Sequence, residues 1–117
     1  MSHIRDLTSH EQEIIRSLLS GAESTRGNRE LDISRYRAKT IDDFGSLELI
    51  PRDLKIDTSL PQHPLVSAYF NDENRPEPGA LVNIILFSRD TILSELQIYK
   101  SDGSPLQREI VPSEIYI

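Results

Sequence analysis

Residues 95–106 (ELQIYKSDGSPL) constrain the fold of this 117-residue chain more than any other stretch. Leu96 and Ile98 alternate with more polar residues, which is the two-residue period of a strand that buries one face. The sequence SDGSP at 101–105 then ends the pairing, because Asp and Ser side chains bond their own backbone, glycine accommodates a positive φ and proline lacks a donor. The stretch therefore predicts a half-buried strand that stops at a sharp turn, and it contains no reactive group.

A helix is predicted near the N-terminus. Residues 8–11 (TSHE) match a capping box, in which the Thr8 side chain accepts a hydrogen bond from a backbone N–H and Glu11 bonds back to the N–H of Thr8. Apolar residues then recur at helical spacing, at Ile14, Ile15, Leu18 and Leu19. This pattern predicts a helix over 9–20 that packs one face on a sheet, with Gly21 as the residue just past its end.

Strand patterns follow in the rest of the chain, at 37–41, 45–50, 65–70, 81–87 and 92–100. Residues 31–36 fit either a short strand or a helical turn. Residues 81–87 (LVNIILF) are apolar on both faces except at Asn83, which is typical of a central strand. Two prolines exclude helix and strand from 71–79, so this segment is predicted to be a loop between strands of an antiparallel meander.

These elements predict a single α+β domain over residues 1–117. Its expected architecture is a twisted antiparallel sheet of about five or six strands, a meander with the N-terminal helix packed on one face. The apolar end of the chain, residues 115–117 (IYI), is expected to pack on this domain.

Composition restricts the compartment and the class of protein. The chain has no cysteine, which excludes a disulfide framework and a thiolate metal site and fits a reducing compartment. The first residues contain no apolar core of a signal peptide, and no apolar run approaches the roughly 20 residues of a membrane helix. A cytoplasmic protein with no membrane partner is expected.

The net charge of −6 is distributed unevenly along the chain. Residues 1–41 contain seven Arg and Lys against six Asp and Glu, whereas residues 42–117 contain six against thirteen. This acidity argues against a nucleic-acid partner, because phosphate binding needs a basic patch. The acids either solvate the strand-rich half or form a surface for a basic partner.

No arrangement of residues points to catalysis, a cofactor or a metal ion. The chain lacks a cysteine nucleophile and a G-x-S-x-G turn, and His3, His10 and His63 are separated in the sequence. The adjacent acids at 42–43 and 72–73 lack EF-hand spacing, and neither a G-x-G-x-x-G nor a Walker loop occurs. The sequence therefore predicts a protein that is not an enzyme and holds no cofactor or metal.

Three segments together resemble a small bacterial family of unknown function. They are L-T-x-x-E-x-x-I-I-x-x-L-L at 7–19, D-D-F-G-S-L at 42–47 and the closing E-L-Q-I-Y-K-S-D-G-S-P-L at 95–106. The chain departs from the family pattern at Tyr99, where tryptophan is usual, and at Asp43 and Phe44, where the turn is richer in glycine. The resemblance implies a fold and no catalytic residue. By type, the small acidic domain also resembles immunity proteins of contact-dependent growth inhibition.

The leading hypothesis is an immunity protein that binds and neutralises a bacterial toxin domain, such as a nuclease. An acidic surface would match the cationic cleft of such a toxin and speed the encounter. The predicted partner-binding residues are the acids Asp42, Asp43, Asp72, Glu73, Glu77 and Asp102, expected in exposed turns, and the aromatics Tyr69 and Tyr99.

Two alternatives remain open at this point. One is a small-molecule-binding or enzymatic domain with a pocket on the sheet near Asn83, although a lone Asn more often bonds to a neighbouring loop inside the core. The other is a homo-oligomeric module in which residues 115–117 pair with a second chain. A monomer or weak dimer is expected otherwise.

Overall fold

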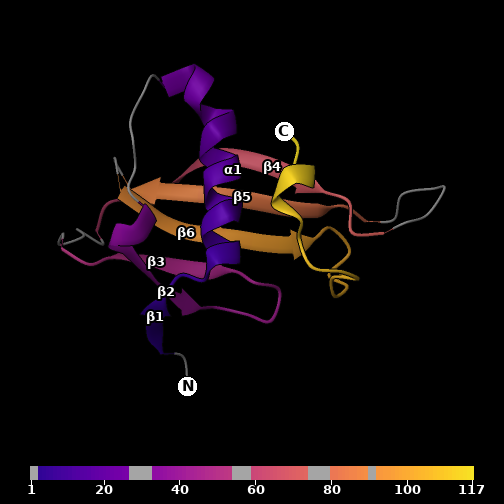
Figure 1. The fold of residues 1–117 in the computed structure, drawn as a ribbon, viewed down its shortest axis with the longest axis horizontal. Coiled ribbons are helices and arrows are strands. Elements are labelled where there is room, and N and C mark those ends of the chain that lie inside the picture. Colours follow the sequence, from indigo (N-terminus) through magenta and orange to yellow (C-terminus); the bar gives the residue numbers. More distant parts are fainter. Residues whose placement is uncertain (1–2, 27–32, 54–58, 74–79, 90–91) are drawn as a thin grey trace.

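The computed structural model describes residues 3–26, 33–53, 59–73, 80–89 and 92–117. In chain order the described elements are β1 (Ile4–Asp6), α1 (Ser9–Arg26), η1 (Ile33–Arg35), β2 (Tyr36–Thr40), β3 (Leu47–Pro51), β4 (His63–Phe70), β5 (Val82–Arg89), β6 (Ile92–Lys100) and η2 (Pro112–Glu114). The six strands form one sheet in the order β1-β2-β3-β6-β5-β4, and α1 lies across one of its faces (Figure 1). The predicted α+β fold is confirmed.

Every pairing in the sheet is antiparallel, and two meanders meet at its centre. β4, β5 and β6 are consecutive neighbours, as predicted, and β1, β2 and β3 form a second set. The two sets are joined where β3 pairs with β6, with Leu47 opposite Leu96. β1 was not predicted, because three residues are too few to reveal a two-residue period.

The capping box at the start of α1 is confirmed. The backbone N–H of Glu11 donates to Thr8 Oγ1 at 3.1 Å, and the N–H of Thr8 donates to Glu11 Oε1 at 2.9 Å. The predicted end of the helix is wrong, because α1 continues through Gly21 to Arg26. A Cβ added at Gly21 would lie 2.1 Å from Cδ1 of Ile117, so this glycine makes room for the C-terminal residue against the helix.

The core lies between α1 and the sheet. Ile14, Ile15 and Leu18 are buried on the helix, as the sequence predicted. They pack in one cluster with inward-facing strand residues, which include Ala38, Leu47, Leu49, Val66, Ala68, Phe70, Val82, Ile84, Leu86, Leu96 and Ile98. Alternation along each strand places these residues on the α1 side of the sheet.

We call the side of the sheet opposite α1 the open face. Its central residues are Ser67, Tyr69, Asn83, Ile85, Gln97 and Tyr99, which are cross-strand neighbours. The prediction that residues 81–87 form a central strand is confirmed, because β5 lies between β6 and β4 in the sheet. Ile85 and Phe87 of this strand lie on the open face and are only half-buried. An apolar strand thus contributes surface to the open face.

The turn after β6 has the predicted geometry. Gly103 has a φ of 76°, and Asp102 Oδ1 accepts hydrogen bonds from both the backbone N–H and the hydroxyl of Ser104, at 2.9 and 2.6 Å. The side chain of Asp102 therefore shapes the turn that directs the chain away from the sheet.

Replacing Gly103 by Ala is expected to lower the free energy of unfolding by about 1 kcal/mol, because a left-handed backbone is costly for residues with a Cβ. A Cβ at this position would meet no heavy atom within 4 Å, so backbone strain is the whole effect. Gly103→Asn is the matched control and should lose less, because Asn tolerates this conformation. Equal losses in urea denaturation would contradict this explanation.

Candidate functional site

Three loops gather at one end of the sheet. They are the β2–β3 turn at residues 41–46, the residues 71–73 that follow β4, and the turn at 101–104 that follows β6 (Figure 1, right-hand side). We call this region the acidic end, because it contains Asp42, Asp43, Asp72, Glu73 and Asp102. The antiparallel order of the strands therefore brings five of the six predicted acids to one end, while Glu77 lies outside the described residues.

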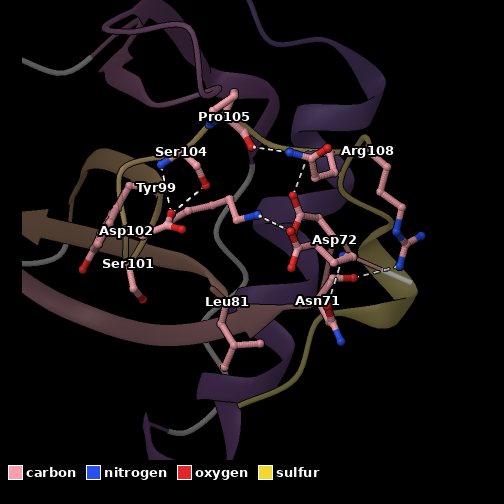
Figure 2. A network of polar contacts seen from close by, with 12 residues as sticks. Asn71, Asp72, Leu81, Tyr99, Ser101, Asp102, Ser104, Pro105 and Arg108 are labelled. Atoms are coloured by element: carbon pink, nitrogen blue, oxygen red, sulfur yellow. Dashed lines mark hydrogen bonds and ion pairs between the residues drawn. The ribbon is translucent and has the colours of Figure 1, made fainter. Parts of the chain in front are cut away.

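The prediction that Asp72 and Glu73 are exposed is wrong. The side chain of Asp72 is 0% exposed and that of Glu73 is 10% exposed. Both face Lys100, whose side chain is 1% exposed and whose Nζ lies 3.1 Å from Asp72 Oδ1 and 3.6 Å from Glu73 Oε1. Figure 2 shows Asp72 next to Asn71, whose carbonyl accepts a hydrogen bond from Arg108. A buried charge needs a partner, so the cation draws this pair of acids into the core.

Lys100 is a site residue that the sequence analysis missed. Leu96 and Ile98 point toward the core, and the same alternation places Lys100 on the buried side of β6. Burial alone would lower the pKa of Lys100, but the hydrogen bond and charge of Asp72, with a contribution from Glu73, raise it above its ordinary value. The lysine therefore stays charged at neutral pH and acts as a structural cation.

A C-terminal strap, residues 104–111, covers this ion pair on the α1 side. The N–H of Gln107 donates to Asp72 Oδ2 at 2.5 Å, and Arg108 donates to the carbonyl of Asn71 at 2.9 Å. The Arg108 guanidinium also lies 4.7 Å from the ring centre of Phe70. At the far end of the strap, His10 Nε2 donates to the carbonyl of Ile110. The contacts around Lys100 thus hold the strap and have a structural role.

The remaining acids differ in how available they are. Asp42 is half-buried and its Oδ1 accepts from the N–H groups of Phe44 and Ser46, at 2.9 and 3.2 Å, so it shapes the turn. Asp43 and Asp102 are exposed. Hydrogen bonds from the side chain and backbone of Ser104 lower the pKa of Asp102 below its ordinary value, which keeps this carboxylate charged. Two predicted acids are therefore exposed to a partner.

The predicted aromatics lie in one row on the open face. Asn83 is the cross-strand neighbour of both Tyr69 and Tyr99, and Tyr116 extends the row by pairing with Tyr69 at the edge of β4. The exposed fractions are 38% for Tyr69, 41% for Tyr99 and 47% for Tyr116. We call these four residues the tyrosine row. It ends beside Asp102, three residues beyond Tyr99 in the chain.

Tyr116 changes the interpretation of the C-terminus. The backbone groups of Tyr116 and Tyr69 exchange hydrogen bonds of 2.7 and 3.0 Å, and the centres of their rings are 5.9 Å apart. The expectation that the apolar end packs is confirmed. Because it pairs with its own chain, it is not available in this state for the pairing with a second chain that the homo-oligomer hypothesis requires.

Asn83 does not lie inside the core. It is half-buried on the open face, and its Nδ2 lies 3.4 Å from the carbonyl of Leu81, 3.5 Å from that of Tyr99 and 3.0 Å from Ser101 Oγ. The expected bond to a neighbouring loop is present through Ser101. The amide therefore holds the start of the turn after β6 next to the tyrosine row.

Other kinds of site find little support in the described part of the chain. It contains no group of three or more His, Asp or Glu side chains placed to hold a metal ion. An open recess is lined by Ile4, Arg37, Ile50, Pro51, Arg52 and Asp53, away from the tyrosine row. No helix within the described ranges has the length and apolar character needed to cross a membrane.

Comparison with known protein families places the chain in one of them. The family model described as Domain of unknown function (DUF6984) matches residues 4–110. The chain belongs to the DUF6984 family. No curated protein and no solved structure matches it. The resemblance to a small family of unknown function is thereby confirmed.

The DUF6984 region contains most of the candidate site. It spans the whole sheet, α1, the acidic end, Lys100 and nearly all of the strap, and it ends at Ile110. Three members of the tyrosine row lie inside the DUF6984 region and Tyr116 lies outside it.

Proposed function

We propose that this DUF6984 protein acts by binding another protein on the open face next to the acidic end, and that the partner is a bacterial toxin domain which it neutralises. The observation that carries the proposal is the row of exposed tyrosines beside exposed carboxylates. The proposed partner is a toxin domain with a cationic cleft, and the chain blocks that cleft by occupying it.

The open face has the composition of a protein interface. Tyrosine is enriched in such interfaces and among their energetically dominant residues, because its ring buries a large apolar area and its hydroxyl can hydrogen-bond. Tyr69, Tyr99 and Tyr116 are exposed, and half-buried Ile85 and Phe87 extend the apolar surface. A surface of this kind on one face of a small domain supports a binding role.

The charge of the acidic end supports a basic partner. Asp72 and Glu73 are buried beside Lys100, so the proposed contact surface does not include them. Asp43 and Asp102 remain exposed, and the chain carries a net charge of −6. Exposed charges next to an interface act mainly by accelerating association with an oppositely charged partner.

The double variant Asp43→Asn/Asp102→Asn is expected to slow association with the toxin domain several-fold at low salt while changing dissociation little. The test measures stopped-flow rates at low and high ionic strength, and the candidate partner is a toxin domain sought among the genes next to the one that encodes this chain. Glu13→Gln, an exposed change on α1, is the control and should leave both rates unchanged.

Two outcomes would contradict the proposal. A tight complex whose association rate does not change with ionic strength would contradict the proposed role of the acidic charges. A neighbouring toxin domain whose toxicity is unaffected by co-expression of this chain would remove the neutralising role.

A further inference from the structure

We propose that the centre of the tyrosine row, formed by Tyr99, Asn83 and Tyr69, is a subsite for an arginine side chain of the protein partner. The inference rests on the proposed function insofar as it takes the open face to be the binding surface. It adds that the partner presents an arginine at this position, whereas the net charge of the chain indicates only that the partner is basic.

The hydrogen-bond partners of the Asn83 side chain fix the orientation of its amide. Its nitrogen faces the carbonyl oxygens of Leu81 and Tyr99 and the hydroxyl of Ser101. Carbonyl oxygens only accept, so the NH₂ group and not the oxygen must lie on this side. Oδ1 therefore lies on the other side of the amide, and it accepts a hydrogen bond from no described residue. The row thus has a fixed acceptor at its centre.

Tyr99 and Tyr69 lie on the two strands on either side of Asn83. Neighbouring strands are about 4.8 Å apart, so the backbones of Tyr99 and Tyr69 lie about 10 Å apart with Asn83 between them. Both tyrosines are exposed. Aromatic faces carry negative potential and attract a cation placed over them. The rings of Tyr99 and Tyr69, with the Asn83 amide oxygen between them, therefore favour binding of a planar cation that can both stack on a ring and donate a hydrogen bond.

The described residues of the row include no cation that would compete with one from a partner. The nearest base in the chain is Lys100, which points to the opposite side of the sheet and is paired with Asp72. Asp102 and Glu114, which lie three residues after Tyr99 and two before Tyr116 in the chain, are both exposed acids. Guanidinium is planar, stacks on aromatic rings and presents five donors, whereas the lysine ammonium is a compact and strongly hydrated charge. Arginine therefore fits this row better than lysine.

The test uses three short peptides of the form acetyl-Gly-X-Gly-amide, in which X is arginine, lysine or citrulline. Citrulline has the shape of arginine without its charge. Binding is followed by NMR through the Asn83 side-chain amide, and by tyrosine emission, because the chain has no tryptophan and three of its four tyrosines are in the row. The arginine peptide is expected to bind about tenfold more tightly than the citrulline peptide.

Three single variants test whether the aromatic ring of Tyr99, and not the rest of the open face, causes the preference for arginine. Tyr99→Leu should abolish the preference for arginine over citrulline, whereas Tyr99→Phe, which keeps an aromatic face, should retain most of it. Gln97→Ala, a change on the open face outside the row, is the control and should leave the preference intact.

Equal binding of the arginine and citrulline peptides, or a preference that survives Tyr99→Leu, would overturn the subsite. If the peptides do not discriminate but Tyr99→Leu still weakens binding of the toxin domain, the arginine subsite fails and the proposed function stands. If the arginine preference is present but the toxin domain does not bind, the subsite stands and the proposed partner is wrong.

Discussion

Replacing Lys100 by Met is expected to destabilise the protein by about 3–5 kcal/mol, the cost of removing one partner from a buried ion pair. Methionine is unbranched and only one atom shorter than lysine, and the change removes the cation that Asp72 and Glu73 face. The penalty comes from the carboxylates, which lose their counter-charge where their side chains are only 0% and 10% exposed. Urea denaturation at neutral pH measures it.

A control substitution of an exposed lysine, and a variant that removes all the buried charges, test whether the lost counter-charge causes the loss of stability. Lys39→Met removes an exposed lysine from β2 and is expected to change stability by less than about 0.5 kcal/mol. The triple variant Lys100→Met/Asp72→Asn/Glu73→Gln removes the buried charges together and should recover a large part of the loss, since neutral amides are cheaper to bury. Similar stabilities for the two single lysine variants would contradict a buried ion pair at the acidic end.

Leu18→Ala is expected to cost about 2–5 kcal/mol, because it removes a fully buried side chain and leaves a cavity between α1 and the sheet. Leu18 and Ile15 are both 0% exposed, so Ile15→Ala should fall in the same range. Thermal unfolding of each variant gives the loss directly.

The control for the helix is Glu13→Ala, which lies on the exposed side of α1 between the same turns. Alanine has the highest helix propensity, so this variant should be neutral or slightly more stable. Unchanged stability in Leu18→Ala and Ile15→Ala would show that α1 does not pack on the sheet, which would contradict the fold itself.

The fold was largely predictable because its main elements carry strong local patterns. The boundaries of β6 follow from alternation that ends at a turn of Asp, Gly and Pro, and the start of α1 follows from Thr8 and Glu11. The end of α1 was not predictable, since Gly21 is used there for the approach of Ile117, a contact between residues 96 positions apart. Such a contact leaves no signal in the local sequence.

The candidate site was predictable in its residue types and less so in its exposure. Turn acids and strand tyrosines were found from their positions, but Asp72 was taken to be exposed because its loop is polar. One signal pointed the other way, namely the inward position of Lys100 in the alternation of β6. Tyr116 was missed because its place in the row depends on a bridge to β4 that only the tertiary structure reveals.

The central claim, that the open face binds a protein partner, is tested most directly by photo-crosslinking in the source cell. A photoreactive amino acid replaces Ser67, exposed at the centre of the open face, or Glu13, exposed on α1, in otherwise identical full-length chains. The proposal predicts a specific crosslink to a toxin domain from position 67 and none from position 13. Crosslinks from position 13 alone, or the same products from both positions, would contradict it.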